Sequence, residues 1–298
     1  MRTLRLGVIA ALTAALVLSS VNAFAVDAGH RARRAPVIAA AGDIASAGSP
    51  GHGQQRTTSL LRSLRLTALL VLGDAQYEDG LYHEYLGSYD STWGRFLRKT
   101  HPVPGNHDYR TGDADGYFRY FGRRAHGAHG GYYSFNLGRW HLIALNSSDG
   151  DGPSSAQLAW LRRNLRRNRD RCELAFWHHP RFSSGVNHGS DRAMAPYWEV
   201  LQPAGVDVVL NGHEHNYERF KKMHPGGGAS PNGMREFVVG TGGKGGDYPF
   251  LSHPLRTSQV RLQGLGVLRM RLRPGAYSWQ FVRPGGRILD RGSTSCHA

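Results

Sequence analysis

The sequence predicts an α/β fold of the mixed (α+β) kind, in which two β-sheets form a sandwich flanked by helices. Two observations support this. In the first half of the chain, apolar strand-like runs alternate with helical segments, which implies parallel strands joined by right-handed crossovers. In the middle and at the end of the chain, apolar runs lie close together around short turns, as the strands of antiparallel hairpins do.

The first half is predicted to begin with a strand, a helix and a second strand. Leu60, Leu61 and Leu64 share one face of the expected helix, and an apolar run stands on each side of it. Each of the two runs ends at a Gly-Asp pair, Gly42-Asp43 and Gly73-Asp74. The elements expected in this half are strands over 37–41 and 67–72 and helices over 54–64 and 80–97.

The rest of the chain supplies antiparallel pairs and further helices. A Gly-containing turn at 136–139 joins two apolar runs, and Pro274-Gly275 joins the last two. The Gly- and Pro-rich stretch 222–232 is interpreted as a surface loop. No long Pro/Ser linker interrupts the sequence, so residues 36–298 are expected to form a single domain. The expected strands are 132–135, 140–145, 173–177, 206–210, 235–239, 266–273 and 276–283, and the expected helices are 154–169 and 191–201.

The first 25 residues have the pattern of a secretory signal. Arg2 and Arg5 give a positive start, residues 6–21 are almost wholly apolar or small, and Ala23-Phe24-Ala25 offers a small-x-small cleavage pattern. An N-terminal membrane anchor is the alternative, although the apolar run is short for a spanning helix. We therefore expect a signal peptide over 1–25 and a mature protein that is secreted or otherwise extracytoplasmic, and no longer in the membrane.

Cys172 and Cys296 are the two cysteines of the chain. In an exported protein, an even pair of cysteines predicts one disulfide. This bond would tie the C-terminal tail to the start of the strand expected over 173–177. A cysteine-based metal site is not expected, because no second cysteine lies near either residue in the sequence.

The composition is strongly basic, with 37 Lys and Arg against 22 Asp and Glu and a formal net charge of +15. A positive field attracts anionic substrates, and it is also typical of proteins that bind nucleic acid. Several arginines lie opposite Leu158, Leu161 and Leu165 on the helix expected over 154–169, which is an ordinary amphipathic arrangement. No basic stretch is interleaved with aromatic residues, so no specific nucleic-acid partner is expected.

Five short segments carry metal-ligand side chains, and most of them follow an apolar strand-like run. In open α/β sheets, ligands bind beyond the carboxyl ends of the strands, which is where these segments are expected. Carboxylate, amide and imidazole groups suit hard and borderline metal ions. Together the segments predict a site for two metal ions, with Asp74 as the bridging carboxylate. The five are Gly42-Asp43, 73–77 with Asp74 and Tyr77, 105–108 with Asn106 and His107, His178-His179, and 212–215 with His213 and His215.

This set is similar to the motifs of the calcineurin-like metallophosphoesterase superfamily and, within it, of the purple acid phosphatase branch. That branch has Gly-Asp, Gly-Asp-x-x-Tyr, Gly-Asn-His-Asp or Glu, a His after a strand, and Gly-His-x-His, as this sequence does. The likeness extends into Asn216-Tyr217-Glu218-Arg219 and covers nearly the whole mature chain. The resemblance implies a metallophosphatase-like sandwich that hydrolyses phosphate monoesters by means of a metal-bound hydroxide.

The resemblance also implies a role for each residue of the site. His107 would bind phosphate or protonate the leaving alkoxide, and His188, in the loop after His178, would face the substrate. The metal pair would be iron with iron, zinc or manganese, because a tyrosine phenolate favours a ferric ion in that branch. The implied ligands of one metal ion are Asp43, Asp74, Tyr77 and His215, and those of the other are Asp74, Asn106, His178 and His213.

Two positions leave the assignment open. The wider superfamily has His two residues after the first Asp, where this sequence has Ala45, and the purple branch usually has Gly there. Tyr77 supplies the compensating ligand. The family pattern places the ligand before x-Pro and so selects His178. His179 is the alternative, since neighbours in an extended segment point to opposite sides and only one of them can serve.

The sequence thus predicts an exported phosphoesterase with two metal ions and a small phosphorylated substrate. A phosphodiesterase with the same metals is the nearest alternative, because the sequence does not reveal the shape of the pocket. A secreted protein that binds metal or phosphate without catalysis is another, and the retention of His107 beside Asn106 argues against it. The Gly-x-Ser-x-Gly motif of serine hydrolases is absent from the sequence.

Overall fold

The computed structural model describes residues 35–48, 52–126, 130–150, 152–168, 172–245 and 247–297, which belong to a compact unit beginning at Ala35. The signal peptide expected over 1–25 lies outside the described residues. Among the residues that are described, no helix is both long and apolar enough to cross a lipid bilayer.

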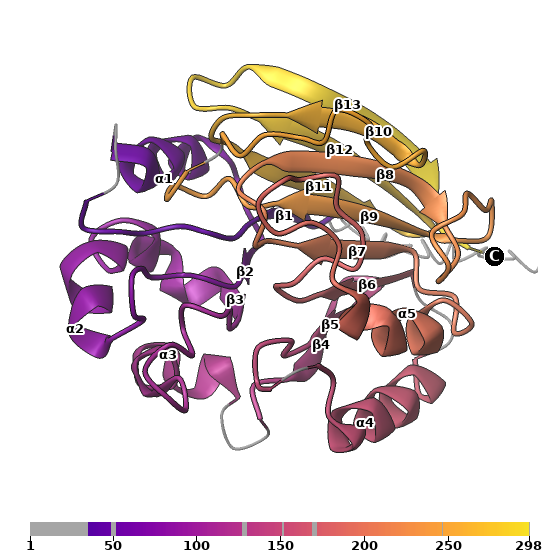
Figure 1. The fold of residues 1–298 in the computed structure, drawn as a ribbon, viewed down its shortest axis with the longest axis horizontal. Helices are drawn as coiled ribbons and strands as arrows, with labels where there is room; N and C mark the ends of the chain where they lie inside the picture. Colours follow the sequence, from indigo (N-terminus) through magenta and orange to yellow (C-terminus); the bar gives the residue numbers. More distant parts are fainter. Residues whose placement is uncertain are drawn as a thin grey trace, which may run out of the picture. The chain divides into compact units, whose positions relative to one another are not determined.

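The described strands form two sheets (Figure 1). Apolar side chains of both sheets belong to one buried cluster. One sheet has the strand order β13-β12-β11-β1-β2-β3, and the other has the order β10-β8-β9-β7-β6-β5-β4. The strands are β1 (Val37–Ala41), β2 (Ala68–Leu72), β3 (Thr100–Val103), β4 (Tyr133–Leu137), β5 (Trp140–Ala144), β6 (Cys172–Phe176), β7 (Val208–Asn211), β8 (Tyr217–Met223), β9 (Met234–Val239), β10 (Ser258–Leu262), β11 (Val267–Arg273), β12 (Ala276–Val282) and β13 (Ile288–Ser295).

Each sheet combines a parallel block with antiparallel strands. The neighbours β1, β2 and β3 run parallel, and so do β5, β6, β7 and β9. The strands β4, β8 and β10 in one sheet, and β11, β12 and β13 in the other, pair antiparallel. The predicted α/β fold with two sheets is therefore confirmed. The block of β1, β2 and β3 lies in the first half of the chain, where parallel strands were predicted, whereas the block of β5, β6, β7 and β9 extends into the later part, where antiparallel pairs were expected.

Along the sequence, most of the described helices connect two strands that are parallel neighbours in a sheet. The crossover helix α4 begins after Ser154, whose hydroxyl accepts a hydrogen bond from the Gln157 backbone N–H at 3.2 Å. This is an ordinary N-cap, and it explains why the helix begins where the sequence indicated. The α-helices of the described residues are α1 (Gly53–Ser63), α2 (Tyr82–Glu84), α3 (Asp115–Phe121), α4 (Ser155–Arg166) and α5 (Ala195–Leu201).

Alternate residues of the parallel strands pack into different clusters, because successive side chains of a strand point to opposite faces. Leu174 of β6 belongs to the buried cluster between the sheets, together with Met270 of β11. The next residue, Ala175, belongs to a second buried cluster with Leu161 of α4 and Trp198 of α5. Helices therefore cover the outer face of this sheet, as the sequence predicted, and Figure 1 shows α4 and α5 beside β5 and β6.

The single helix predicted over 80–97 is wrong. The segment contains α2, a π-helical turn at Tyr85–Tyr89 and a 3₁₀ segment at Trp93–Lys99. The Ser88 hydroxyl bonds back to the Glu84 carbonyl at 3.3 Å, and the Thr92 hydroxyl bonds back to the Ser88 carbonyl at 2.8 Å. Such side-chain bonds compete with the regular helical ladder and distort it.

The predicted disulfide between Cys172 and Cys296 is confirmed, with an S–S distance of 2.07 Å and a Cα–Cα distance of 5.7 Å. Cys172 is the first residue of β6, so the bond attaches the segment after β13 to the amino end of a central strand. The carboxyl end of the same strand leads to His178. The disulfide therefore lies at the opposite end of β6 from the candidate site.

Candidate metal centre

The predicted site residues follow the carboxyl ends of the parallel strands. Asp43 follows β1, Asp74 follows β2, Asn106 follows β3, His178 follows β6 and His213 follows β7. Parallel strands end at the same edge of a sheet, so each block delivers its polar residues to one place. Contacts between the sheets then bring the two groups together.

Two contacts across the sheets fix this meeting point. The backbone N–H of His213 donates to Asp43 Oδ2 at 2.9 Å. The ring nitrogen Nδ1 of His178 lies 2.8 Å from the backbone oxygen of Leu72. Because a carbonyl oxygen can only accept, Nδ1 carries the proton, and the lone pair of Nε2 is free for a metal ion.

One cluster of oxygen and nitrogen atoms surrounds the phenol of Tyr77. The phenol oxygen lies 2.8 Å from Asp43 Oδ1 and 2.8 Å from Asp74 Oδ2. It lies 3.1 Å from His215 Nε2, which in turn is 3.3 Å from Asp43 Oδ1. All four residues are buried. The structure thus places together the four side chains that the resemblance implied as ligands of one metal ion.

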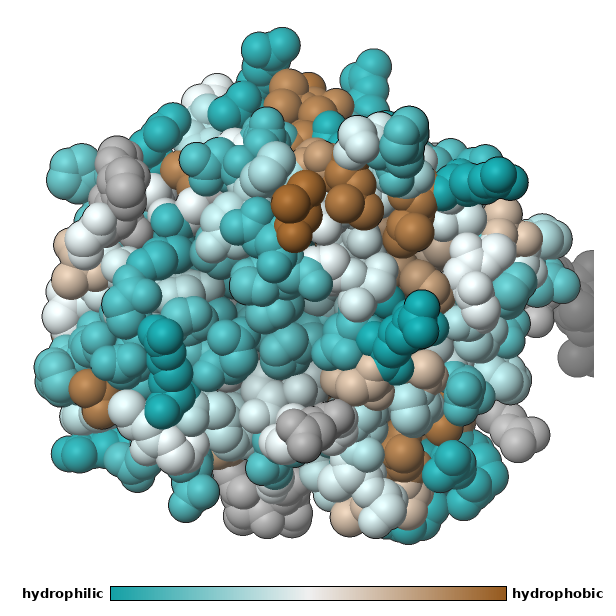
Figure 2. Space-filling model, viewed as in Figure 1, coloured by the Kyte–Doolittle hydropathy of each residue, from teal (hydrophilic) through white to brown (hydrophobic). Residues whose placement is uncertain are grey.

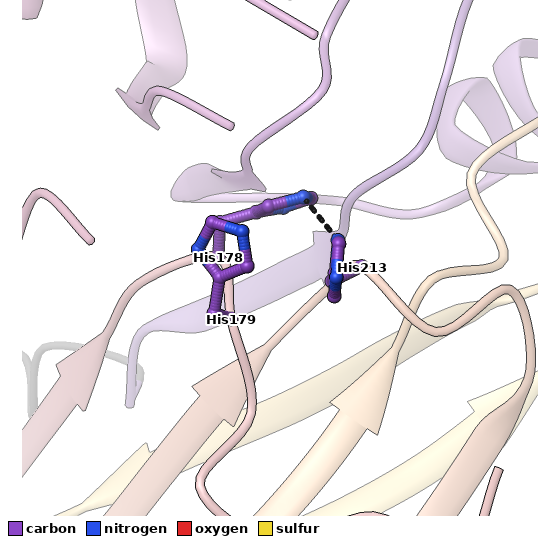
Figure 3. Close-up of side chains that lie close together, drawn as sticks. All are labelled: His178, His179 and His213. Carbon is purple, nitrogen blue, oxygen red and sulfur yellow. Dashed lines mark hydrogen bonds between the residues drawn. The ribbon is translucent and has the colours of Figure 1, made fainter. Parts of the chain in front are cut away.

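A second cluster surrounds Nε2 of His178. This nitrogen lies 3.0 Å from Asn106 Oδ1, 3.1 Å from His213 Nδ1 and 3.4 Å from Asp74 Oδ2. Figure 3 shows the rings of His178, His179 and His213 gathered beyond the strand ends, with the contact between His178 and His213 dashed. Asp74 contacts both clusters, which is the place that the sequence predicted for a bridging carboxylate.

His178 and His179 have different surroundings. Nδ1 of His179 lies 3.0 Å from the hydroxyl of Ser147. Burial lowers the pKa of His179 to about 3. Burial would also lower the pKa of His178, but the charge of Asp74 raises it to about 9. His178 is therefore the member of the pair that contacts the carboxylate of Asp74. Ring nitrogens of His178, His179 and His213 nevertheless all lie within 4.8 Å of one another.

The backbone is strained at three of the predicted ligands. Asp43, Asp74 and His213 have φ angles of 61°, 47° and 70°. A left-handed conformation costs a residue other than glycine about 1–3 kcal/mol, and such residues cluster at functional sites. Close packing adds a demand for glycine, because a Cβ atom on Gly105 would lie 2.1 Å from Asp74 Oδ1. The sharp turns after the strands thus aim these side chains at one another.

The donor set fits cations. Asp43 and Asp74 are buried carboxylates that contact the same phenol oxygen, and buried like charges are stable only when cations or hydrogen-bond donors compensate them. Burial, and then the charges of both carboxylates, raise the pKa of Tyr77 well above its usual range. A nearby cation would reverse that effect. Carboxylate, amide, phenol and imidazole donors together suit hard and borderline metal ions.

The two predicted catalytic histidines lie at the border of the clusters. Nδ1 of His107 contacts the backbone oxygen of Glu78 at 2.6 Å, and its ring centre lies 4.2 Å from that of Tyr77. The ring of His188 stacks on His213 with the centres 4.1 Å apart, and His188 is exposed. Both side chains therefore lie beside the predicted ligands.

The backbone of Ala45 contacts Tyr77, the residue that the sequence indicated as the compensating ligand. Ala45 is fully buried, and its carbonyl oxygen accepts the backbone N–H of Tyr77 at 2.7 Å. The backbone of the position thus holds Tyr77 in place. The phenol of Tyr77 then reaches Asp43 and Asp74.

Sequence reasoning missed three residues next to the site. Asp108, the last residue of Gly-Asn-His-Asp, is buried and accepts the Gly105 N–H at 2.8 Å, and burial raises its pKa to about 7. Glu214 stands between His213 and His215, and its carboxylate accepts backbone N–H groups of the loop that carries His188. The ring of Tyr248 stacks on His215 with centres 4.3 Å apart. The first two lie inside recognised motifs, whereas no pattern marks Tyr248.

The comparison with known proteins agrees with this geometry. The family model "Calcineurin-like phosphoesterase" matches residues 36–217. Purple acid phosphatase 21 of Arabidopsis thaliana is 32% identical over 208 residues, which are 63% of this chain and 46% of that protein. Fe(3+)-Zn(2+) purple acid phosphatase 12 of the same plant is 26% identical over 279 residues, which are 80% of this chain and 56% of that protein. The chain therefore matches about half the length of these relatives.

Solved structures share the fold. The purple acid phosphatase PPD1 from yellow lupin seeds superposes with a TM-score of 0.70 at 17% identity, over 87% of this chain and 53% of that one. A dimetal phosphatase from Danio rerio gives a TM-score of 0.62 at 14% identity, over 89% of this chain and 100% of that one. The family model covers well over half of the sequence and includes every motif of the two clusters. The chain belongs to the calcineurin-like phosphoesterase family and is homologous to the purple acid phosphatases.

Proposed function

We propose that the chain is an exported hydrolase of phosphate monoesters that holds two metal ions in the two clusters described above. The observation that carries the proposal is the position of Asp74, whose carboxylate contacts both the Tyr77 cluster and the His178 cluster. The proposed ligands are Asp43, Asp74, Tyr77 and His215 for one ion, and Asp74, Asn106, His178 and His213 for the other. Tyr77 supports a ferric ion at the first position, with iron, zinc or manganese at the second.

Two such cations would supply Lewis acidity, lowering the pKa of a water ligand and balancing the charge of the phosphate oxygens. The chain's own residues hold and orient the reacting groups. The backbone oxygen of Glu78 accepts the proton on Nδ1 of His107, so Nε2 is the ring atom that remains available for the substrate. We assign His107 the transfer of a proton to the leaving oxygen and His188 a contact with the phosphate.

Export is part of the proposal. It is supported by the signal pattern at 1–25 and by the disulfide between Cys172 and Cys296, because such bonds persist in oxidising compartments. The strongly basic composition suits a small phosphorylated substrate.

Assays with p-nitrophenyl phosphate and bis(p-nitrophenyl) phosphate test the proposed reaction. We expect the purified chain to hydrolyse the monoester with the higher kcat/KM. A clear preference for the diester would support a phosphodiesterase with the same centre. A chain that retains its metal but hydrolyses neither compound would refute the assignment as an enzyme.

The His107→Ala variant tests the role of the proton donor. We expect turnover of the monoester to fall by about 10²–10⁴-fold, which is the usual contribution of a general acid. The metal content should stay that of the wild type, because His107 belongs to neither proposed ligand set. His83→Ala, at an exposed position on α2, is the matched control and should keep full activity. An active His107→Ala enzyme would exclude His107 as the proton donor.

A further inference from the structure

The side chain of Glu214 contacts the loop that carries His188. Glu214 stands between two of the proposed metal ligands in the sequence, and its side chain is fully buried. Its Oε2 atom accepts the backbone N–H groups of His188 at 2.9 Å and Gly189 at 3.0 Å. Its Oε1 atom accepts the N–H of Asn187 at 3.2 Å. The carboxylate is thus compensated by three consecutive N–H groups and serves as the anchor of residues 187–189.

The loop approaches Glu214 so closely that it requires a glycine. A Cβ atom on Gly185 would lie 2.1 Å from the carboxyl carbon Cδ of Glu214. The carboxylate therefore packs directly against the loop backbone and leaves no room for a water molecule on that side. An anchor with this packing fixes the path of the loop as well as its hydrogen bonds.

Two further buried carboxylates hold the same loop upstream. The backbone N–H of Ser184 donates to Glu218 Oε2 at 2.7 Å, and that of Phe182 donates to Glu236 Oε1 at 3.3 Å. Both acids are fully buried. Residues 182–189 are therefore attached by carboxylates at several points, and Glu214 is the one that holds the end of the loop next to the metal centre.

The position of His188 depends on this anchor. His188 is exposed, and its ring stacks on His213 at 4.1 Å, with Tyr248 at 5.9 Å. An exposed side chain is held only as firmly as its backbone. Since the N–H groups at and beside His188 bond to Glu214, the same carboxylate sets where the imidazole can lie.

We propose that Glu214 is a positioning residue, which holds His188 over the metal centre so that the imidazole is ordered before phosphate binds. This inference rests on the proposed function for the metal centre, the phosphate ligand and the kinetics, whereas the contacts of Glu214 with residues 187–189 do not depend on it. A pre-positioned group binds its ligand without a further ordering cost. Loss of the anchor should therefore weaken the interaction with phosphate and leave the proposed metal ligands in place.

The Glu214→Gln variant tests the proposal, because the amide nitrogen cannot accept a hydrogen bond and at least one loop N–H loses its partner. We expect hydrogen exchange at the amides of 187–189 to become at least about tenfold faster. We expect the affinity for inorganic phosphate and kcat/KM to fall by about tenfold, as is usual for groups that orient a site. Metal content should not change. Glu218→Gln, the same substitution at the contact with Ser184, is the control and should keep wild-type kinetics.

A second arm separates positioning from a general structural role. In a His188→Ala background, Glu214→Gln should cause no further loss of phosphate affinity or kcat/KM, because the group that it positions is absent. The proposal would be overturned if Glu214→Gln lowered phosphate affinity and kcat/KM equally with and without His188. It would also be overturned if the variant lost metal, or if amide exchange at 187–189 did not change. If Glu214→Gln does not fold, Glu214→Asp keeps the charge but is too short to reach all three N–H groups, and the same outcomes decide.

Failure of the proposed function can be distinguished from failure of the role proposed for Glu214. A wild-type chain that hydrolyses no phosphoester would refute the proposed function. The exchange and phosphate-binding measurements would still decide the role of Glu214 in that case, since neither depends on turnover.

Discussion

Replacement of Asp74 by alanine is expected to abolish phosphoester hydrolysis and to empty the metal centre. The Asp74 carboxylate lies 2.8 Å from the phenol oxygen of Tyr77 and 3.4 Å from Nε2 of His178, so both proposed metal positions depend on it. Removing a single stabilising donor from an active site costs about 10²–10³-fold in turnover. A ligand shared by both ions should cost more, and we expect a fall of at least about 10³-fold.

Initial rates with p-nitrophenyl phosphate and elemental analysis of the purified variant check this expectation. Asp113→Ala is a suitable control, because Asp113 is an exposed aspartate outside both clusters, and it should keep activity and metal. An Asp74→Ala variant with wild-type turnover would show that the reaction does not use this centre.

Removal of the disulfide between Cys172 and Cys296 is expected to give the largest loss of stability. The bond joins residues 124 positions apart, and cross-links that close loops of this size restrict the unfolded chain most. Substitution of both cysteines by serine should lower the free energy of unfolding by about 2–5 kcal/mol. Activity below the unfolding transition should persist, because Cys172 begins β6 whereas His178 follows its other end.

Urea unfolding of the wild type and of the double variant measures this effect. A reducing agent should destabilise the wild type by a similar amount and leave the double variant unchanged. Equal unfolding free energies for the two proteins in the absence of reductant would contradict the expected contribution of the disulfide.

Most of the parallel strands could be predicted because they are buried on both faces, whereas β3 (THPV) was not among the predicted strands. The runs Val37–Ala41 and Ala68–Leu72 are apolar throughout, and every residue in them is buried. The strands β10 and β13 could not be predicted in this way. Their sequences, SQVRL and ILDRGSTS, mix polar and exposed residues because they form the edges of the sheets. A strand with a solvated side carries too weak a hydrophobic pattern to stand out from a loop.

The loop predicted over 222–232 was partly wrong for a related reason. β8 extends to Met223, and its residues Lys221 and Lys222 are not buried. Polar residues at a strand end resemble the start of a loop. The pairing with β9, which the sequence does not display, decides where the strand ends.

The clustering of the proposed ligands could be predicted because their motifs follow strand ends, whereas the residues that support them could not. Glu214 is an acidic residue within a histidine motif, which would suggest another ligand. The structure instead turns its carboxylate to the N–H groups of 187–189. The sequence could not indicate this contact, because the donors are backbone N–H groups, which nearly every residue type has.

The metal-to-protein ratio of the purified wild-type chain tests the central claim most directly. The proposed arrangement predicts two metal ions per chain, with a tyrosinate-to-iron absorption band that disappears in Tyr77→Phe. A chain that contains no metal and still hydrolyses p-nitrophenyl phosphate, or one that binds a single ion at full activity, would contradict it.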